Sequence, residues 1–311
     1  MKTICVIGGA NIDICGISEK PLVDYDSNPG RISLSFGGVG RNIAEICALL
    51  HGNVKFVTCF ADDDFGRMIK EDCMTLGMHC EDAMMVKGLP TSMYLAIMDE
   101  VGDMRMAMND MRLLASIDKN RLQGVVQSLD HDDMIILDAN LEKEALHMVA
   151  TCAPCPVAVD PVSAAKAGKF LPVLDRISIF KPNRYEAEAM NGIAITDESS
   201  GAESVRWFME KGVKEVLVSL AEDGVLFGRN GKISRFHHRR IHVENATGGG
   251  DALIGAYVKM RTDGYDTDES IRFALSAAAT EIALDKMERR TLNSEAIRAN
   301  MNDLEIEESI L

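Results

Sequence analysis

The hydrophobic positions of this chain fall into two alternating patterns. Short apolar runs rich in β-branched residues alternate with longer segments whose apolar residues recur at helical spacing. The short runs predict buried strands at 3–7, 54–60, 134–137, 156–159, 177–180 and 216–220. The longer segments predict helices at 41–51, 65–77, 142–151, 184–191, 199–211, 252–261 and 267–285. This alternation is typical of an α/β fold with a mostly parallel sheet and helices on both faces.

Two segments depart from the α/β pattern. Residues 91–99 and 103–109 look like two strands joined by a turn at 100–103, which predicts a hairpin. Residues 14–36 lack helical spacing and are rich in turn formers. We expect a single domain, 1–311, with lid segments at about 14–36 and 91–110 that form a small β-sheet over one edge. An equally weighted interpretation is that these two segments are insertions without a function.

Composition and charge narrow the class of protein. The chain has 311 residues, of which 47% are hydrophobic and 26% charged, as in globular proteins with a sizeable core. Its 33 basic and 48 acidic residues give a net charge of −15, which argues against nucleic acid or an anionic membrane as partner. No apolar run approaches the roughly 20 residues that span a bilayer, and the N-terminus has no signal-peptide pattern. The eight scattered cysteines predict reduced thiols in the cytoplasm, and Cys152 with Cys155 is only a weak indication of zinc.

The run 245–251 combines two parts of a phosphoryl-transfer site. Gly248, Gly249 and Gly250 allow backbone N–H groups to crowd into a nest for an anion. The helix expected next adds its positive end at the same place. Asp251 stands at that end, where a carboxylate can accept a proton from an attacking hydroxyl. We therefore assign Asp251 and the three glycines as catalytic, with an ordinary glycine-rich turn as the alternative.

A second group of polar residues follows the first predicted strand and precedes the first helix. Asn11 and Asp13 stand two residues apart, so on an extended chain they point the same way. A carboxamide and a carboxylate together suit vicinal hydroxyls. Gly37 and Gly38 allow close approach of a ligand to the backbone, and Asn42 falls in the first turn of the helix. Taken alone, the glycine pair is more simply a tight turn.

A third group follows the predicted strand 177–180. Asn183 and Glu186 are spaced i, i+3 and share one helix face. A carboxylate and an amide in this position could hold the water shell of Mg²⁺, which prefers oxygen ligands and keeps several waters. The same two residues also fit the N-cap and N3 positions of a capping box, so both interpretations stand.

The order and spacing of these segments resemble the ribokinase-like, or PfkB, family of carbohydrate and nucleoside kinases. Residues 37–42 look like its N-terminal signature, and residues 183–186 look like its N-x-x-E motif. Residues 245–251 look like its C-terminal signature, usually D/N-x-T-G-A-G-D. The resemblance covers essentially the whole chain. It implies a three-layer ribokinase-like sandwich with a mostly parallel central sheet and a small β-sheet lid.

The resemblance also implies cofactors and residue roles. It implies ATP and Mg²⁺, with Glu186 on the metal side. It assigns the nucleotide to Asn183, Ser219, Gly224, Thr247, Gly248 and Gly250. It assigns the substrate to Asn11, Asp13, Gly37, Gly38 and Asn42, with Ser92, Asn109 and Asn140 as further candidates.

The expected acceptor is a nucleoside. Segments 26–30, 109–111 and 160–164 resemble the branch of the family for which pseudouridine, phosphorylated on its 5′-hydroxyl, is the expected substrate. Ribose, a purine nucleoside or a keto-sugar acid are alternatives. A different class of function, also considered, is that of a non-catalytic regulator that binds a sugar or nucleoside. A nicotinamide-dependent oxidoreductase is disfavoured because the chain lacks G-x-G-x-x-G. A homodimer through the lid is a further expectation.

Three positions depart from the family pattern. Gly249 replaces the usual alanine, which is expected to loosen the loop. A monovalent cation is a candidate cofactor, but Asn245 stands where sugar kinases often have aspartate beside that cation. Residues 219–224 replace a Thr/Ser-x-Gly-x-x-Gly motif, and Ala221 at the first glycine position leaves less room near the adenine.

Overall fold

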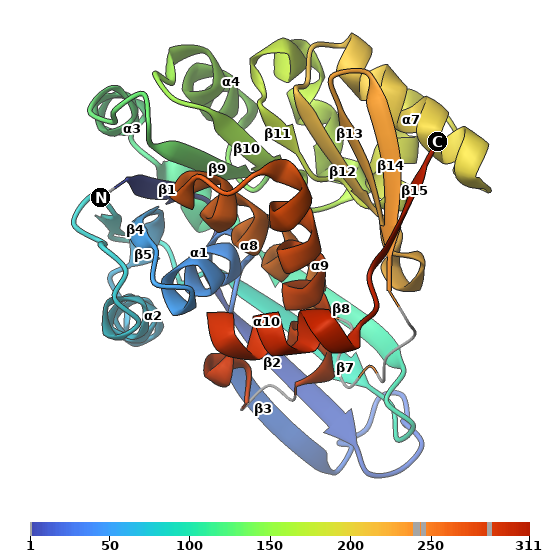
Figure 1. Ribbon diagram of the computed structural model, residues 1–311. Coiled ribbons are helices and arrows are strands. Elements are labelled where there is room, and N and C mark those ends of the chain that lie inside the picture. The colour runs from blue at the N-terminus through green and yellow to red at the C-terminus, as the bar shows by residue number, and fades with distance from the viewer. Residues whose placement is uncertain (1, 239–242, 244–246, 285–287) are drawn as a thin grey trace.

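A nine-stranded sheet is the centre of the computed structural model, which describes residues 2–238, 243, 247–284 and 288–311 (Figure 1). Its strands are β1 (Thr3–Ile7), β4 (Asn53–Val57), β9 (Met134–Asp138), β10 (Val157–Asp160), β11 (Ile179–Phe180), β12 (Glu215–Ser219), β13 (Val225–Arg229), β14 (Lys232–His237) and β15 (Glu307–Ile310). They lie in the order β15-β14-β13-β12-β11-β10-β9-β1-β4. Pairing is parallel from β12 to β4 and antiparallel from β12 to β15. The parallel strands therefore end together at one edge.

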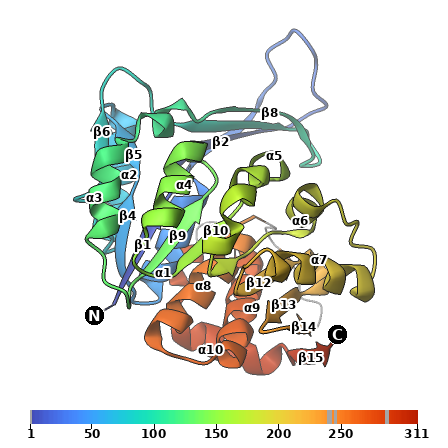
Figure 2. The same ribbon diagram turned by 90° about the horizontal axis from the view of Figure 1, so that it is seen from above.

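Helices cover both faces of this sheet (Figure 2). On one side lie α1 (Val39–Leu49), α8 (Gly249–Asp263), α9 (Thr267–Ala283) and α10 (Ser294–Asp303). On the other lie α3 (Lys119–Gln127), α4 (Lys143–Cys152), α5 (Ala164–Ala167), α6 (Arg184–Asn191) and α7 (Glu198–Glu210). The helix α2 (Asp64–Thr75) packs near the β4 edge.

The two cores follow from strand alternation. In β1, Ile4 and Val6 pack into the core shared with α1, α8 and α9, whereas Cys5 and Ile7 pack into the core shared with α3, α4 and α7. Successive side chains of a strand point to opposite faces, so a continuous apolar run fills both cores. This is why the buried parallel strands were recognisable in the sequence as uninterrupted apolar runs.

A separate four-stranded sheet projects beyond the main sheet (Figure 1). Its strands are β2 (Asn11–Ser18), β3 (Gly30–Gly37), β7 (Met93–Met98) and β8 (Met104–Asp110), in the order β3-β2-β7-β8. Several of its apolar side chains are exposed, among them Ile32, Leu34, Leu95, Met106 and Met108. The expected α/β fold with a small β-sheet lid is confirmed. The single-domain assignment and the homodimer through the lid stay predictions.

The structure differs from the predicted elements in several places. The run 54–60 forms two strands because β5 (Cys59–Ala61) leaves the main sheet to pair with β6 (Met84–Val86). The lid strand β2 begins at Asn11, earlier than expected, since the Ile12 amide bonds the Ser92 carbonyl at 2.9 Å. Strands β6 and β13 to β15 and helices α3, α5 (Ala164–Ala167) and α10 were not predicted. The predicted helix 267–285 ends at Ala283, and residue 285 lies outside the described residues.

Three further observations concern possible membrane, disulfide and metal features of the protein. Within the described residues, no helix combines the length and apolar character needed to cross a membrane. The eight cysteines are unpaired thiols. The described residues also contain no group of three or more His, Cys, Asp or Glu side chains placed to hold a metal ion.

Backbone packing between Gly8 and Gly40 brings the end of β1 against the start of α1. A Cβ on Gly40 would lie 2.7 Å from the Gly8 Cα, and a Cβ on Gly8 would lie 2.9 Å from the Gly40 Cα. Both distances are far below a normal contact, so no side chain fits at either position. This contact sets the distance between the loops that carry Asn11 and Asn42.

We predict that Gly40→Ala lowers the free energy of unfolding by about 1–3 kcal/mol, because the new methyl group overpacks against backbone. Gly124→Ala is the matched control, since Gly124 also lies in a helix but has open space around it. There, alanine is expected to stabilise by up to about 1 kcal/mol. Urea unfolding of both variants tests this, and equal stability of the two would contradict the packing argument.

Candidate active site

The N-terminus of α8 carries the predicted catalytic residues. The helix begins at Gly249, and Gly248 is its N-cap with φ +93° and no side-chain cap. The first N–H groups of a helix have no partner within it, so those of Gly249, Gly250 and Asp251 remain available to an anion. A Cβ on Gly249 would lie 2.8 Å from Ile282 Cγ2 on α9. The alanine that is usual at this position of the signature would therefore be crowded against Ile282, which explains why glycine is favoured at position 249.

Asp251, the predicted base, lies beside Asn42, which was assigned to the substrate. The Asn42 Nδ2 donates to Asp251 Oδ2 at 2.9 Å, although 209 residues separate the two. Burial, together with the nearby carboxylates of Asp160 and Asp138, raises the pKa of Asp251 to about 7. The Asn42 bond and the Lys181 ammonium oppose this rise. A general base works best when its pKa lies near the working pH, so this environment suits proton transfer near neutrality.

Asp138, at the end of β9, organises the loops around the site. Its Oδ2 accepts the backbone N–H groups of Gly9 and Gly40, each at 2.8 Å. Its Oδ1 accepts the Asn140 backbone N–H at 2.8 Å, and the Asn140 Nδ2 donates to Oδ2 at 3.0 Å. The side chain is 0% exposed, and burial raises its pKa against these hydrogen bonds. Sequence reasoning missed Asp138, because an aspartate at a strand end is common.

Asn11 and Asp13 lie together as predicted. The Asn11 Nδ2 donates to Asp13 Oδ1 at 2.6 Å. The Asp13 carboxylate lies directly over the Cα of Gly37, where a Cβ would overlap it. Gly38 adopts φ +100°, a conformation that favours glycine. The predicted ribose group is therefore one cluster at the junction of β2, β3 and α1.

A cavity of about 830 Å³ lies between the lid and the body of the protein. Asn109 and Asn140, both predicted substrate residues, line it. Its other lining residues include the lid side chains of Ile14, Leu95 and Met108 and the ammonium-bearing Lys166 and Lys169. Ser92 is buried, and the bond that links it to β2 uses its backbone carbonyl.

Lys166 was not predicted and lies beside Asn140 in this cavity. Its Nζ donates to Asn140 Oδ1 at 2.6 Å. Burial lowers the pKa of Lys166, against the raising effect of Asp138. The Asn140 carbonyl oxygen is thus partly used, whereas the Lys166 ammonium has three N–H donors in all. No sequence signal distinguished Lys166 from other helical lysines.

Asn183 and Glu186 form a capping box at the start of α6. The Asn183 side chain accepts the Glu186 backbone N–H at 2.9 Å, and Glu186 Oε2 accepts the Asn183 backbone N–H at 2.7 Å. Glu186 is 2% exposed, and burial together with Asp160 raises its pKa while Lys181 lowers it. The Asn183 Nδ2 also donates to Glu186 Oε1 at 2.8 Å. A carboxylate with both oxygens in such bonds still has lone pairs for metal-bound water. It therefore fits a water-mediated role toward Mg²⁺, with direct contacts left to phosphates.

The predicted nucleotide residues of the β12–β13 turn adjoin the capping box. Ser219 donates its backbone N–H to the Pro182 carbonyl at 3.0 Å. Ala221 adopts φ +52°, and Gly224, at φ +87°, has no room for a Cβ against the Phe236 carbonyl. Ala221 thus adopts a backbone conformation that favours glycine, at the first glycine position of the Thr/Ser-x-Gly-x-x-Gly motif.

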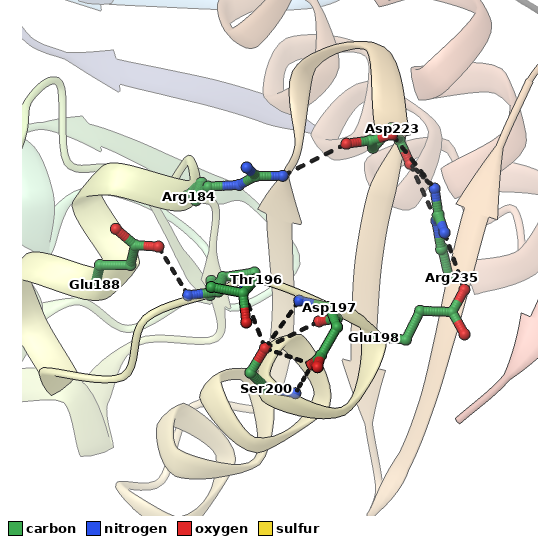
Figure 3. Close-up of polar contacts among 9 residues, drawn as sticks. Arg184, Glu188, Thr196, Asp197, Glu198, Ser200, Asp223 and Arg235 are labelled. Carbon is green, nitrogen blue, oxygen red and sulfur yellow. Dashed lines mark hydrogen bonds and ion pairs between the residues drawn. The ribbon is translucent and has the colours of Figure 1, made fainter.

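Ion pairs hold this turn in place (Figure 3). Arg184 contacts Asp223 at 3.4 Å, and Arg235 contacts both Asp223, at 3.7 Å, and Glu198, at 2.9 Å. These contacts join α6, α7 and β14 to the turn. Thr247 is exposed, and its carbonyl accepts a bond from Arg289. Asn245, the predicted neighbour of a monovalent cation, lies outside the described residues.

Comparison with known proteins identifies the family to which this chain belongs. Residues 1–285 match the pfkB family of carbohydrate kinases, and the chain belongs to this family. The fold agrees: a ribokinase from Thermotoga maritima superposes with a TM-score of 0.86 at 23% identity, over 97% of this chain and 100% of that one.

Two curated relatives act on nucleosides according to their names. The chain is 34% identical over 284 residues to the pseudouridine kinase of Escherichia coli K12, covering 91% of each protein. It is 25% identical to the guanosine-inosine kinase of Exiguobacterium acetylicum, covering 91% of this chain and 95% of that protein.

We predict that Asp251→Asn lowers kcat by about 10²–10⁴, the usual cost of losing a general base, with little change in substrate binding. The wild-type rate should fall as the pH drops below about 7, because only the carboxylate accepts a proton. The measurement is a pH profile of ADP release. Asp263→Asn, at the other end of α8, is the matched control and should keep the wild-type rate. Near-normal turnover of a folded Asp251→Asn protein would rule out the assignment.

Proposed function

We propose that this kinase transfers the γ-phosphoryl group of ATP to the 5′-hydroxyl of a nucleoside, and that pseudouridine is its preferred acceptor. The product would be pseudouridine 5′-phosphate. The observation that carries the chemistry is the Asn42–Asp251 pair at the start of α8, beside the uncapped N–H groups of that helix. The choice of acceptor is supported by the 34% identity with a pseudouridine kinase over most of both chains.

The proposed reaction is a direct transfer. Asp251 takes the proton of the 5′-hydroxyl, whose oxygen forms a bond to the γ-phosphorus while the bond to the bridging oxygen of ADP breaks. Charge on the transferred group is stabilised by the N–H groups of Gly249 and Gly250, with Gly248 closing the loop. Bound Mg²⁺ neutralises phosphate charge, and Glu186 with Asn183 would hold its waters. Ser219, Gly224 and Thr247 would lie along the nucleotide.

The ribose is assigned to the cluster at the junction of lid and body. Asn11 and Asp13 are hydrogen-bonded to each other, so one offers donors and the other acceptors to the 2′- and 3′-hydroxyls. Gly38 brings backbone close to the same place, and Asn42 links the cluster to Asp251. These contacts to the ribose hydroxyls would therefore set the distance from the 5′-oxygen to the Asp251 carboxylate.

The nucleobase is assigned to the cavity of about 830 Å³ beneath the lid. Apolar lid residues such as Leu95 and Met108 would cover the face of the ring, and Asn109, Asn140 and Lys166 would meet its polar edge. Pseudouridine differs from uridine by a C-glycosidic link and an additional ring N–H. An amide oxygen could accept that N–H, and Lys166 could donate to a ring carbonyl. Closure of the lid would exclude water from the phosphoryl group.

A purine nucleoside is the second candidate acceptor, supported by the 25% identity with a guanosine-inosine kinase. A panel of nucleosides and sugars with ATP and Mg²⁺, followed by ADP release, tests both candidates. Highest turnover with ribose or a keto-sugar acid would contradict a nucleoside acceptor. Ligand-dependent stabilisation without ATP turnover would indicate a binding regulator instead.

We predict that 2′-deoxy and 3′-deoxy nucleosides are poor acceptors. A site built around a hydroxyl leaves its own polar groups unpaired when the hydroxyl is missing, at about 1–3 kcal/mol per bond. Asp13→Ala should raise KM for the nucleoside far more than KM for ATP. Asp24→Ala, in the exposed turn of the lid, is the control and should change neither. Equal use of deoxy and ribo substrates would count against this ribose site.

We predict that pseudouridine exceeds uridine in kcat/KM by at least about tenfold, the value of one buried hydrogen bond. Asn109→Ala or Asn140→Ala should narrow this ratio, whereas Asn120→Ala on the exposed face of α3 should leave it unchanged. The measurement is competitive turnover of the two nucleosides at low concentration. A ratio near one for the wild type would reject pseudouridine as the preferred acceptor while leaving the kinase chemistry intact.

A further inference from the structure

A buried lysine lies next to the glycine loop, and the mechanism above does not use it. Lys181 follows β11 and is 5% exposed. Its Nζ lies 2.7 Å from Oδ2 of Asp160, which ends the neighbouring strand β10 and is 3% exposed. Parallel pairing of β10 and β11 places both strand ends at the same edge of the sheet. Burial of an ion pair contributes little to stability by itself, so this pair invites a functional explanation.

Gly250 places the ammonium within the anion-binding loop. A Cβ on Gly250 would lie 2.8 Å from the Lys181 Nζ. The ammonium therefore packs against the Cα of Gly250, in space that any side chain would fill. Gly250 is the second residue of α8, whose first N–H groups are uncapped. Backbone donors and a full positive charge thus lie close together at the start of α8.

We propose that Lys181 is a catalytic residue whose ammonium contacts the transferred phosphoryl group beside the Gly250 N–H, and that Asp160 holds the ammonium there. The inference rests on the proposed phosphoryl transfer. During transfer, negative charge is spread over the equatorial oxygens of the phosphoryl group. Lys181 stays protonated throughout: it gives up no proton and forms no covalent bond. Its ammonium supplies a positive charge that is already in position where negative charge develops during the transfer.

The charges around Asp251 supply an independent readout. Asp160 and Asp138 raise the pKa of Asp251, whereas Lys181 lowers it, and Asn42 donates a hydrogen bond that also lowers it. Glu186 faces Lys181 from α6 and, with Asp160, holds the pKa of Lys181 above its usual value against the effect of burial. Removal of Lys181 should therefore raise the pKa of Asp251, and removal of the Asp160 charge should lower it.

The test uses Lys181→Met, Asp160→Asn and the double variant. Lys181→Met should lower kcat by about 10²–10³, as loss of one oxyanion donor does, and shift the acidic limb of the pH profile upward. Asp160→Asn should shift that limb downward. The double variant buries no unpaired charge, so it should recover stability lost by Lys181→Met. Its kcat should nevertheless stay low. Lys214→Met, an exposed lysine, is the control.

The outcomes separate the inference from the proposed function. If the double variant recovers both stability and the wild-type kcat, Lys181 is only structural and the inference is overturned. The same conclusion follows if Lys181→Met folds and keeps both kcat and the position of its pH limb. If the wild type releases no ADP with any acceptor of the panel, the proposed function fails, and the inference fails with it.

Discussion

The geometry of the site depends on the buried carboxylate of Asp138. One of its oxygens accepts the backbone N–H groups of both Gly9 and Gly40, which belong to segments about thirty residues apart. An unpaired carboxylate in this position would cost several kcal/mol, so the two segments are held together wherever Asp138 stays ionised. The absence of side chains on Gly8 and Gly40 makes that approach possible. Asn11, Asn42 and the lid strands take their positions from this junction.

The site also concentrates negative charge in a way that a structure selected for stability alone would avoid. Asp138, Asp160, Glu186 and Asp251 all lie near Lys181 or near one another, and burial raises the pKa of Asp251 to about 7. Because this pKa lies above its ordinary value of 3.8, the contribution of Asp251 to stability is present at low pH and is lost as the pH rises through about 7. Such a cost is typical of functional sites, where a perturbed carboxylate serves as a base. This concentration of carboxylates would favour the binding of a cationic metal together with its nucleotide.

The lid gives the site two chemically different walls. Its strands present Ile14, Leu95 and Met108 to the cavity, whereas the body presents Asn140 and Lys166. An apolar wall excludes water and a polar wall selects orientation, which is the usual division in small-molecule sites. The lid sheet is joined to the main sheet through β2, whose first residues also carry the predicted hydroxyl contacts. If those contacts form, substrate binding and lid position would be coupled through β2.

The sequence by itself determined the features that depend on nearby residues. Buried strands are short apolar runs, so β1 was predicted at its observed bounds, and α6 likewise, because its Asn183–Glu186 capping box is local. The glycines before Asp251 marked the start of α8 for the same reason.

Only the tertiary structure decided which distant residues meet. Asp138 bonds Gly40 across 98 residues, and Asn42 bonds Asp251 across 209. Lys166, which meets Asn140, looks in sequence like an ordinary helical lysine. Apolar runs of parallel strands are nearly interchangeable as patterns, so they do not encode the order of the strands in the sheet. That order placed β10 beside β11, and with it Lys181 beside Asp160 and the glycine loop.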